Sequence, residues 1–130
     1  MNKKLKTINI KGKDYVEVNE RLKYFRSNYP KYSLTTEVVD KTPDTILIKA
    51  TIRDEQDREI VTGIAEEVKG STFINKTSYV ENCETSAWGR ALANMGIGLD
   101  TSVASAEEVQ NAIANQNSKS KGAYTLKVGD

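Results

Sequence analysis

The stretch that decides the fold runs from Tyr79 to Gly98 and reads YVENCETSAWGRALANMGIG. Its apolar residues recur at helical spacing, which predicts a single helix with one apolar face. The residues of that face are Val80, Cys83, Ala87, Ala91 and Met95. Because most of them and their neighbours Ser86, Gly89 and Ala93 are small, we expect the helix to lie close against a sheet.

The sequence also predicts how this helix ends. Gly96 can adopt the left-handed backbone conformation that often follows a helix, and Ile97 can then fold back to make a hydrophobic contact. Gly98 allows the chain to change direction after the helix. The single cysteine, Cys83, falls on the apolar face, so we interpret it as a small buried hydrophobic residue and not as a reactive thiol.

The segments before this helix predict another helix and three strands. Asp14 and Glu17 form a capping-box pattern, and an apolar stripe at Val18, Leu22, Phe25 and Tyr29 then runs to Pro30. Three strands are expected at Ser33 to Asp40, Thr45 to Arg53 and Ile60 to Val68, with Ile46, Ile48, Ala50 and Ile52 facing inward. The short polar joints between these strands favour an antiparallel meander.

A second capping-box pattern, Ser105 to Glu108, opens a short helix that contains Val109, Ala112 and Ile113. We therefore predict an α+β domain: a helix, a three-stranded antiparallel β-meander, a long helix and a short C-terminal helix. The expected division is an N-terminal extension at residues 1–13, one domain at residues 14–116 and a flexible polar tail at residues 117–130.

Composition bounds the class of function. The chain has 130 residues, 38% of them hydrophobic, and a formal net charge of +1. Overall charge therefore gives no signal for nucleic acid or a membrane, and an anionic ligand needs a local basic patch. The basic start of the chain is followed by polar residues and not by a long apolar run, so we expect a cytoplasmic protein with no membrane span.

The signals for catalysis are weak. The chain has no histidine and one cysteine, and it lacks both glycine-rich phosphate-binding motifs, so we expect no metal, no cofactor and no enzymatic activity. One enzymatic alternative stays open. Asp44 after Pro43, with Glu67 and Lys69 at the end of the third strand, resembles the PD…ExK pattern of metal-dependent nucleases.

The run INKTSYVENCETSAWGRALANMGIG, preceded by a helix and a three-strand meander, resembles the phage single-strand annealing proteins of the Sak and essential-recombination-function type. These are relatives of the eukaryotic Rad-type annealing proteins, and the most specific part of the resemblance is residues 84–92. The resemblance implies a β-β-β-α annealing core and ATP-independent binding and annealing of single-stranded DNA. It also implies a homo-oligomeric ring or filament, a role in phage recombination, and residence in the bacterial host cytoplasm if the protein is phage-encoded. Arg90 stands where the larger relatives tend to carry two basic residues.

Binding of single-stranded DNA requires cations that follow the phosphates and, optionally, aromatic rings for stacking. The candidate DNA-binding residues are Arg90, Lys76, Lys69, Lys49, Arg53 and Tyr79. Lys49 and Arg53 share one face of a strand. That face fits a DNA-binding stripe and the ordinary solvated side of a sheet equally well. Trp88 fits core or interface packing better than base stacking. A passive single-strand or double-stranded RNA binder remains a further alternative, because a helix-sheet-helix module also serves that purpose.

Overall fold

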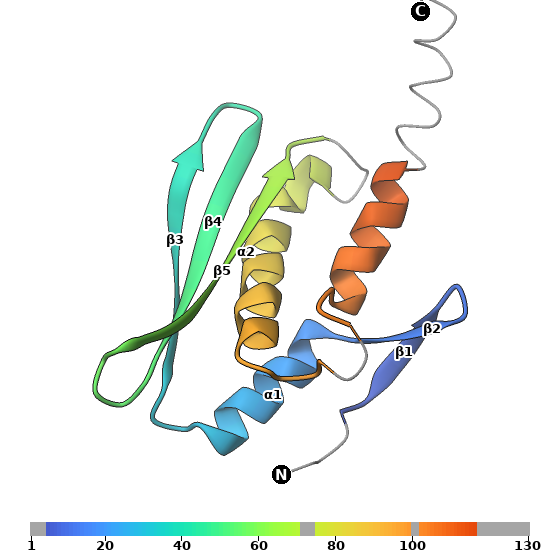
Figure 1. Cartoon of the computed structure of the whole chain (residues 1–130). Coiled ribbons are helices and arrows are strands. Elements are labelled where there is room, and N and C mark those ends of the chain that lie inside the picture. Colours follow the sequence, from blue (N-terminus) through green and yellow to red (C-terminus); the bar gives the residue numbers. More distant parts are fainter. Residues whose placement is uncertain (1–4, 71–74, 100–101, 117–130) are drawn as a thin grey trace, which may run out of the picture.

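Two antiparallel sheets and three helices make up the computed structural model, which describes residues 5–70, 75–99 and 102–116 (Figure 1). The α+β class predicted from the sequence is confirmed. The elements are β1 (Thr7–Ile10), β2 (Lys13–Val16), α1 (Val18–Asn28), β3 (Ser33–Lys41), β4 (Thr45–Arg53), β5 (Glu59–Val68), α2 (Asn75–Asn94) and a third helix over residues 106–116.

The larger sheet is the predicted meander, with the strand order β3-β4-β5 and β4 in the centre. Its inward positions are the predicted ones: Ile46, Ile48, Ala50 and Ile52 are all at most 4% exposed. Helix α2 packs across this face, chiefly over β4 and β5, and α1 packs against α2 (Figure 1). The core therefore lies between the sheet and α2.

Small residues allow α2 to lie close to the sheet, as the sequence predicted. Cys83, Ala87 and Ala91 are fully buried. At Gly63 on β5, a Cβ atom would lie 2.8 Å from the carbonyl oxygen of Ala87, so only glycine fits there. The predicted apolar face was wrong at its first residue. Val80 is 37% exposed, because it lies near the start of the helix, close to the non-helical Ser78.

Helix α2 ends in the predicted manner. Gly96 has a φ of +103°, and the amide of Ile97 donates to the carbonyl of Leu92 at 3.1 Å while the amide of Gly96 donates to Ala93 at 2.9 Å. These two bonds form a Schellman motif, and Ile97 folds back into the core at 5% exposure.

The N-terminal segment differs from the prediction. Residues predicted as an extension form a β-hairpin, in which β1 pairs with β2 across a turn at Lys11 and Gly12, both with positive φ. The predicted capping box at Asp14 was therefore wrong, since Asp14 is a strand residue paired with Asn9. The N-terminus of α1 is capped from far along the chain instead. The amide of Val18 donates to Oε1 of Glu107 at 2.9 Å.

The third helix begins as predicted. Ser105 caps it, since the amide of Glu108 donates to Oγ of Ser105 at 3.2 Å. The loop before it is held by the fully buried Arg21 of α1, whose guanidinium donates to the carbonyl oxygens of Ser102 and Val103 at 2.8 and 3.0 Å. The predicted flexible tail at residues 117–130 lies outside the described residues.

Candidate functional site

Charge is distributed very unevenly over the fold, although the whole chain is nearly neutral. The hairpin and α1, over residues 5–32, contain seven basic and three acidic residues. Residues 33–70, which form the larger sheet, contain five basic and nine acidic residues. The described residues from 75 onward contain two basic and four acidic residues. Positive potential is therefore concentrated on the hairpin and α1.

Helix α1 presents its cations to solvent. It buries Val18, Arg21 and Phe25 on one side, whereas Lys23 and Arg26 project from the exposed side. The side chain of Lys23 is 64% exposed, and the Arg26 guanidinium lies 5.4 Å from the centre of the Phe25 ring. We call the exposed cations of this region the α1 basic surface: Lys6, Lys11, Lys13, Lys23, Arg26 and Lys31.

A surface groove of about 370 Å³ runs between α1 and the segment that leads into β1. Its lining residues are Leu5, Lys6, Glu20, Lys23, Tyr24, Ser27 and Asn28. Within it, Glu20 accepts from Nζ of Lys23 at 3.1 Å and from the backbone amide of Lys6 at 3.4 Å. The hydrogen bond from Lys23 holds the pKa of Glu20 below its usual value. Two cations, an amide, a hydroxyl and an aromatic ring thus border one groove together with the carboxylate of Glu20, which a phosphodiester would have to displace from Lys23.

The six residues predicted as DNA-binding do not share one surface. Arg90 is half exposed on α2, and both its Nε and one Nη lie 3.1 Å from Oε2 of Glu108 on the third helix. The shallow pocket beside it is also lined by Glu66 and Glu67, so its surroundings are acidic. Lys49 and Arg53 lie on the opposite face of the sheet, because they alternate with the inward residues of β4.

The remaining candidates lie elsewhere. Lys69 is in the turn after β5, where its amide donates to the carbonyl of Asp44 at 2.6 Å. Tyr79 packs against the core with the ammonium of Lys41 5.6 Å from its ring centre. Lys76 lies in the first turn of α2. Trp88 is partly buried against the core.

Of the nuclease pattern, Asp44 and Lys69 are joined by a backbone hydrogen bond, whereas Glu67 faces the inner side of the sheet. Glu67 is 7% exposed on the inner side of the sheet, and both of its carboxylate oxygens accept from Nδ2 of Asn111 at 3.0 and 2.9 Å. Asp44 is exposed in the turn before β4. Among the described residues, no group of three or more histidine, cysteine, aspartate or glutamate side chains is placed to hold a metal ion.

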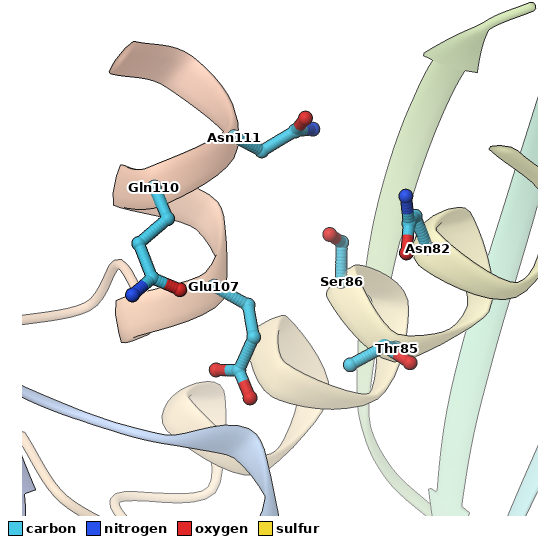
Figure 2. A pocket seen from close by; sticks show the side chains of 6 residues that line it. All are labelled: Asn82, Thr85, Ser86, Glu107, Gln110 and Asn111. Carbon is cyan, nitrogen blue, oxygen red and sulfur yellow. The ribbon is translucent and has the colours of Figure 1, made fainter. Parts of the chain in front are cut away.

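A small pocket lined by polar residue types lies between α2 and the third helix (Figure 2). It encloses about 120 Å³ and is lined by Asn82, Thr85 and Ser86 from α2 and by Glu107, Gln110 and Asn111 from the third helix. Its lining contains amides, hydroxyls and one carboxylate but no cation. It therefore does not suit a phosphate group, and the α1 basic surface is the better anion-binding region.

The order α1-β3-β4-β5-α2, with an antiparallel meander under one long helix, defines the class as an α-β-β-β-α domain whose first helix is basic. A protein-family model described as Slr1353 N-terminal dsRNA-binding domain-like matches residues 22–95, which run from within α1 to the end of α2. The match covers more than half of the chain, and the chain belongs to this family. Searches of the curated proteins and of the solved structures find no significant match. Within the described parts of the chain, no helix has the length and apolar character needed to cross a membrane.

The sequence does contain a signal for the α1 basic surface, because the excess of lysine and arginine before residue 33 is visible without a structure. The predicted DNA-binding residues instead centre on Arg90, within the segment that resembles the annealing proteins. The groove itself depends on Leu5 and Lys6 lying beside α1, and both residues belong to the segment predicted as an N-terminal extension.

Proposed function

We propose that this domain binds nucleic acid through the α1 basic surface, and that its preferred ligand is double-stranded RNA. The observation that carries the proposal is the concentration of exposed cations on the hairpin and α1, next to a sheet that carries excess negative charge. Membership of a family described as dsRNA-binding domain-like supports the choice of ligand.

The chemistry of the groove fits recognition of backbone rather than of bases. Lys6 and Lys23 are placed to neutralise phosphates, and Ser27 and Asn28 offer hydrogen bonds to ribose hydroxyls. Such contacts read the shape of a duplex and carry little sequence information. The proposed role is passive binding, which needs no catalytic step, metal or cofactor.

Fluorescence anisotropy with labelled oligonucleotides tests this proposal. We expect double-stranded RNA to bind more tightly than single-stranded RNA, double-stranded DNA or single-stranded DNA of the same length. The double variant Lys23→Gln with Arg26→Gln should lower the slope of log affinity against log salt by about 2, roughly one unit per lost phosphate contact.

Lys41→Gln is the matched control, because it removes an exposed cation that lies at the end of β3, away from α1. It should leave the affinity and the salt slope close to those of the parent. Equal losses in the control and the double variant would contradict an interface on α1.

Annealing of single-stranded DNA is the second candidate, favoured by the resemblance of residues 84–92 to the Sak-type annealing proteins and by the half-exposed Arg90 within it. This function includes assembly into a homo-oligomer and a role in phage recombination. On this proposal, DNA phosphate must displace Glu108 from Arg90, so Glu108→Gln should speed annealing and Arg90→Ala should slow it.

The pairing rate of two complementary labelled oligonucleotides, measured with and without Mg²⁺, separates the candidates. Accelerated pairing that depends on Arg90 supports annealing. Tight duplex RNA binding without accelerated pairing supports the passive binder. Strand loss that requires Mg²⁺ and disappears in Asp44→Asn with Glu67→Gln would instead identify a nuclease.

A further inference from the structure

The β1–β2 hairpin extends from the rest of the fold (Figure 1). Its two strands pack chiefly against each other and not against the larger sheet or α2. The root of the hairpin is anchored, because Leu5 and Lys6 border the groove beside α1 and Val16 is 1% exposed just before that helix. We call residues 7–16 the hairpin arm. The arm lies outside the family match, which begins at residue 22.

The tip of the hairpin arm presents two lysines to solvent. Lys11 and Gly12 form the turn with φ values of +51° and +87°, and the amide of Gly12 donates to Oδ1 of Asn9 at 3.0 Å. Positive φ at both central residues matches the twist of the paired strands, so the turn is tight. Lys11 and Lys13, on either side of Gly12, are both exposed. Four residues in each strand, at about 3.4 Å each, place this tip about 14 Å from the root.

The two lysines of the hairpin arm are free to bind phosphate. Within the described part of the chain, neither Lys11 nor Lys13 forms an ion pair. Lys23 in the groove, by contrast, is paired with Glu20 at 3.1 Å, so an RNA phosphate must displace a carboxylate there. The arm therefore offers cations that a phosphate can reach without breaking an existing pair.

The sequence around the hairpin arm favours a polyanion as its ligand. Residues 1–16 contain five lysines and a single acidic residue, Asp14. The carboxylate of Asp14 accepts a hydrogen bond from Nδ2 of Asn9 at 3.2 Å. Asp14 and Lys13 are neighbours in one strand, so their side chains point to opposite faces of the hairpin. A phosphate backbone that approaches Lys13 therefore does not meet this carboxylate.

We propose that the hairpin arm is a second contact site for the RNA duplex, and that it binds backbone phosphates beyond the stretch that α1 covers. This inference rests on the proposed function and adds to it a dependence on duplex length. The 11 residues of α1 extend over about 16 Å and the arm over about 14 Å, so together they follow roughly 30 Å of the ligand. A short duplex reaches one of the two sites. A longer duplex reaches both, and the second contact then adds to the affinity as an intramolecular step.

Fluorescence anisotropy with duplex RNAs of about 8 to about 24 base pairs tests the proposal, since this range includes the length that double-stranded RNA-binding domains usually span. The arm variant is Lys11→Gln with Lys13→Gln. On the longest duplex it should bind roughly tenfold more weakly than the parent at low salt, and its slope of log affinity against log salt should be lower by about 2. On the shortest duplex the two proteins should bind alike, because α1 alone is engaged.

Lys41→Gln with Lys69→Gln is the matched control. It removes the same number of charges from two exposed lysines, one at the end of β3 and one just after β5, away from the hairpin arm (Figure 1). This control should bind like the parent at every duplex length. Thermal melting followed by circular dichroism checks that both double variants fold like the parent.

Cross-linking separates direct contact from long-range attraction. Cys83 is buried, so Lys11→Cys provides one accessible thiol to which a photoactivatable cross-linker can be attached. We expect this group to cross-link to the longest duplex RNA. The same group attached to Lys69→Cys, in the turn after β5, should not cross-link.

The possible failures can be told apart. An arm variant that binds like the parent at every length, or that is weakened by the same factor at every length, overturns the inference and leaves the proposed function standing. Cross-linking from Lys11→Cys that is no stronger than from Lys69→Cys does the same. A parent chain that binds no duplex RNA of any length overturns both the proposed function and this inference.

Discussion

The guanidinium of Arg21 in α1 donates a hydrogen bond from Nη1 to the carbonyl oxygen of Gly89 in the middle of α2, at 3.1 Å. Arg21 is fully buried, and the same side chain also binds the loop before the third helix through the carbonyls of Ser102 and Val103. Burial lowers the pKa of this guanidinium, and Glu108 and Glu107 oppose the shift. One side chain thus connects three segments that are far apart in the sequence.

Arg21→Met should destabilise the fold by about 2–5 kcal/mol, because three carbonyl groups lose their donor inside the protein. Urea denaturation measures the change. Arg26→Met is the matched control: Arg26 is exposed on the same helix, and its replacement should change the free energy of unfolding by less than about 0.5 kcal/mol. Equal effects would show that the buried hydrogen bonds contribute little.

Gly63→Ala should destabilise the fold by about 1–3 kcal/mol, because the added Cβ would meet backbone atoms of α2 that cannot move independently. Gly12→Ala offers a comparison without crowding. Nothing lies within 4 Å of a Cβ at Gly12, and the cost there of about 1 kcal/mol comes from its positive φ alone. Thermal melting should rank the two variants in this order, with Gly63→Ala the less stable.

The carboxylate of Asp54 should make stability depend on pH in the acid range. Hydrogen bonds from the backbone amides of Arg58 and Gln56 and from the Arg58 side chain hold its pKa below the ordinary value of 3.8. The unfolded chain therefore takes up this proton at a higher pH than the folded protein does. The contribution of Asp54 to stability is present above pH 3.8 and is lost as the pH falls through the folded-state pKa.

Asp54→Asn should accordingly narrow the difference in urea midpoint between neutral pH and about pH 3. Asp44→Asn, at an exposed turn carboxylate, serves as the control and should keep the parent's acid dependence. An unchanged difference in Asp54→Asn would show that other carboxylates dominate the acid response.

The thiol of Cys83 should be unreactive in the native protein. Burial raises its pKa to about 11, and Sγ lies 3.2 Å from the carbonyl oxygen of Ala65. At about pH 8 roughly one molecule in a thousand carries the reactive thiolate. A colorimetric thiol reagent should therefore label Cys83 at the rate of unfolding, and rapidly in denaturant. Rapid labelling under native conditions would place Cys83 outside the core.

Local patterns predicted the elements that depend on local physics. The alternation of buried and outward residues predicted β4 at Thr45–Arg53, and Gly96 predicted the Schellman motif after α2. Both signals lie within a few neighbouring residues. Ser105 was likewise predicted as a helix cap from its own sequence context.

The errors concern contacts between distant residues. Asp14 fits a helix cap by its spacing, yet it pairs in a hairpin, and the actual cap of α1 comes from Glu107. Arg21 reads as one more charged residue on an amphipathic helix, since its acceptors are backbone carbonyls that carry no sequence signal. The contact between Arg90 and Glu108 is of the same kind, because it depends on the packing of two helices and has no local sequence signal.

Because Glu107 caps α1, the part of the chain that must fold together is longer than the part that matches the family. The family match ends at residue 95, but the carboxylate that caps α1 and two of the acceptors of Arg21 come from residues 102–107. A fragment that ends at residue 95 would expose the start of α1 and leave the buried Arg21 short of acceptors, and one that also begins at residue 22 would lack Arg21 altogether. Excision or transplantation of this domain must therefore take the third helix with it.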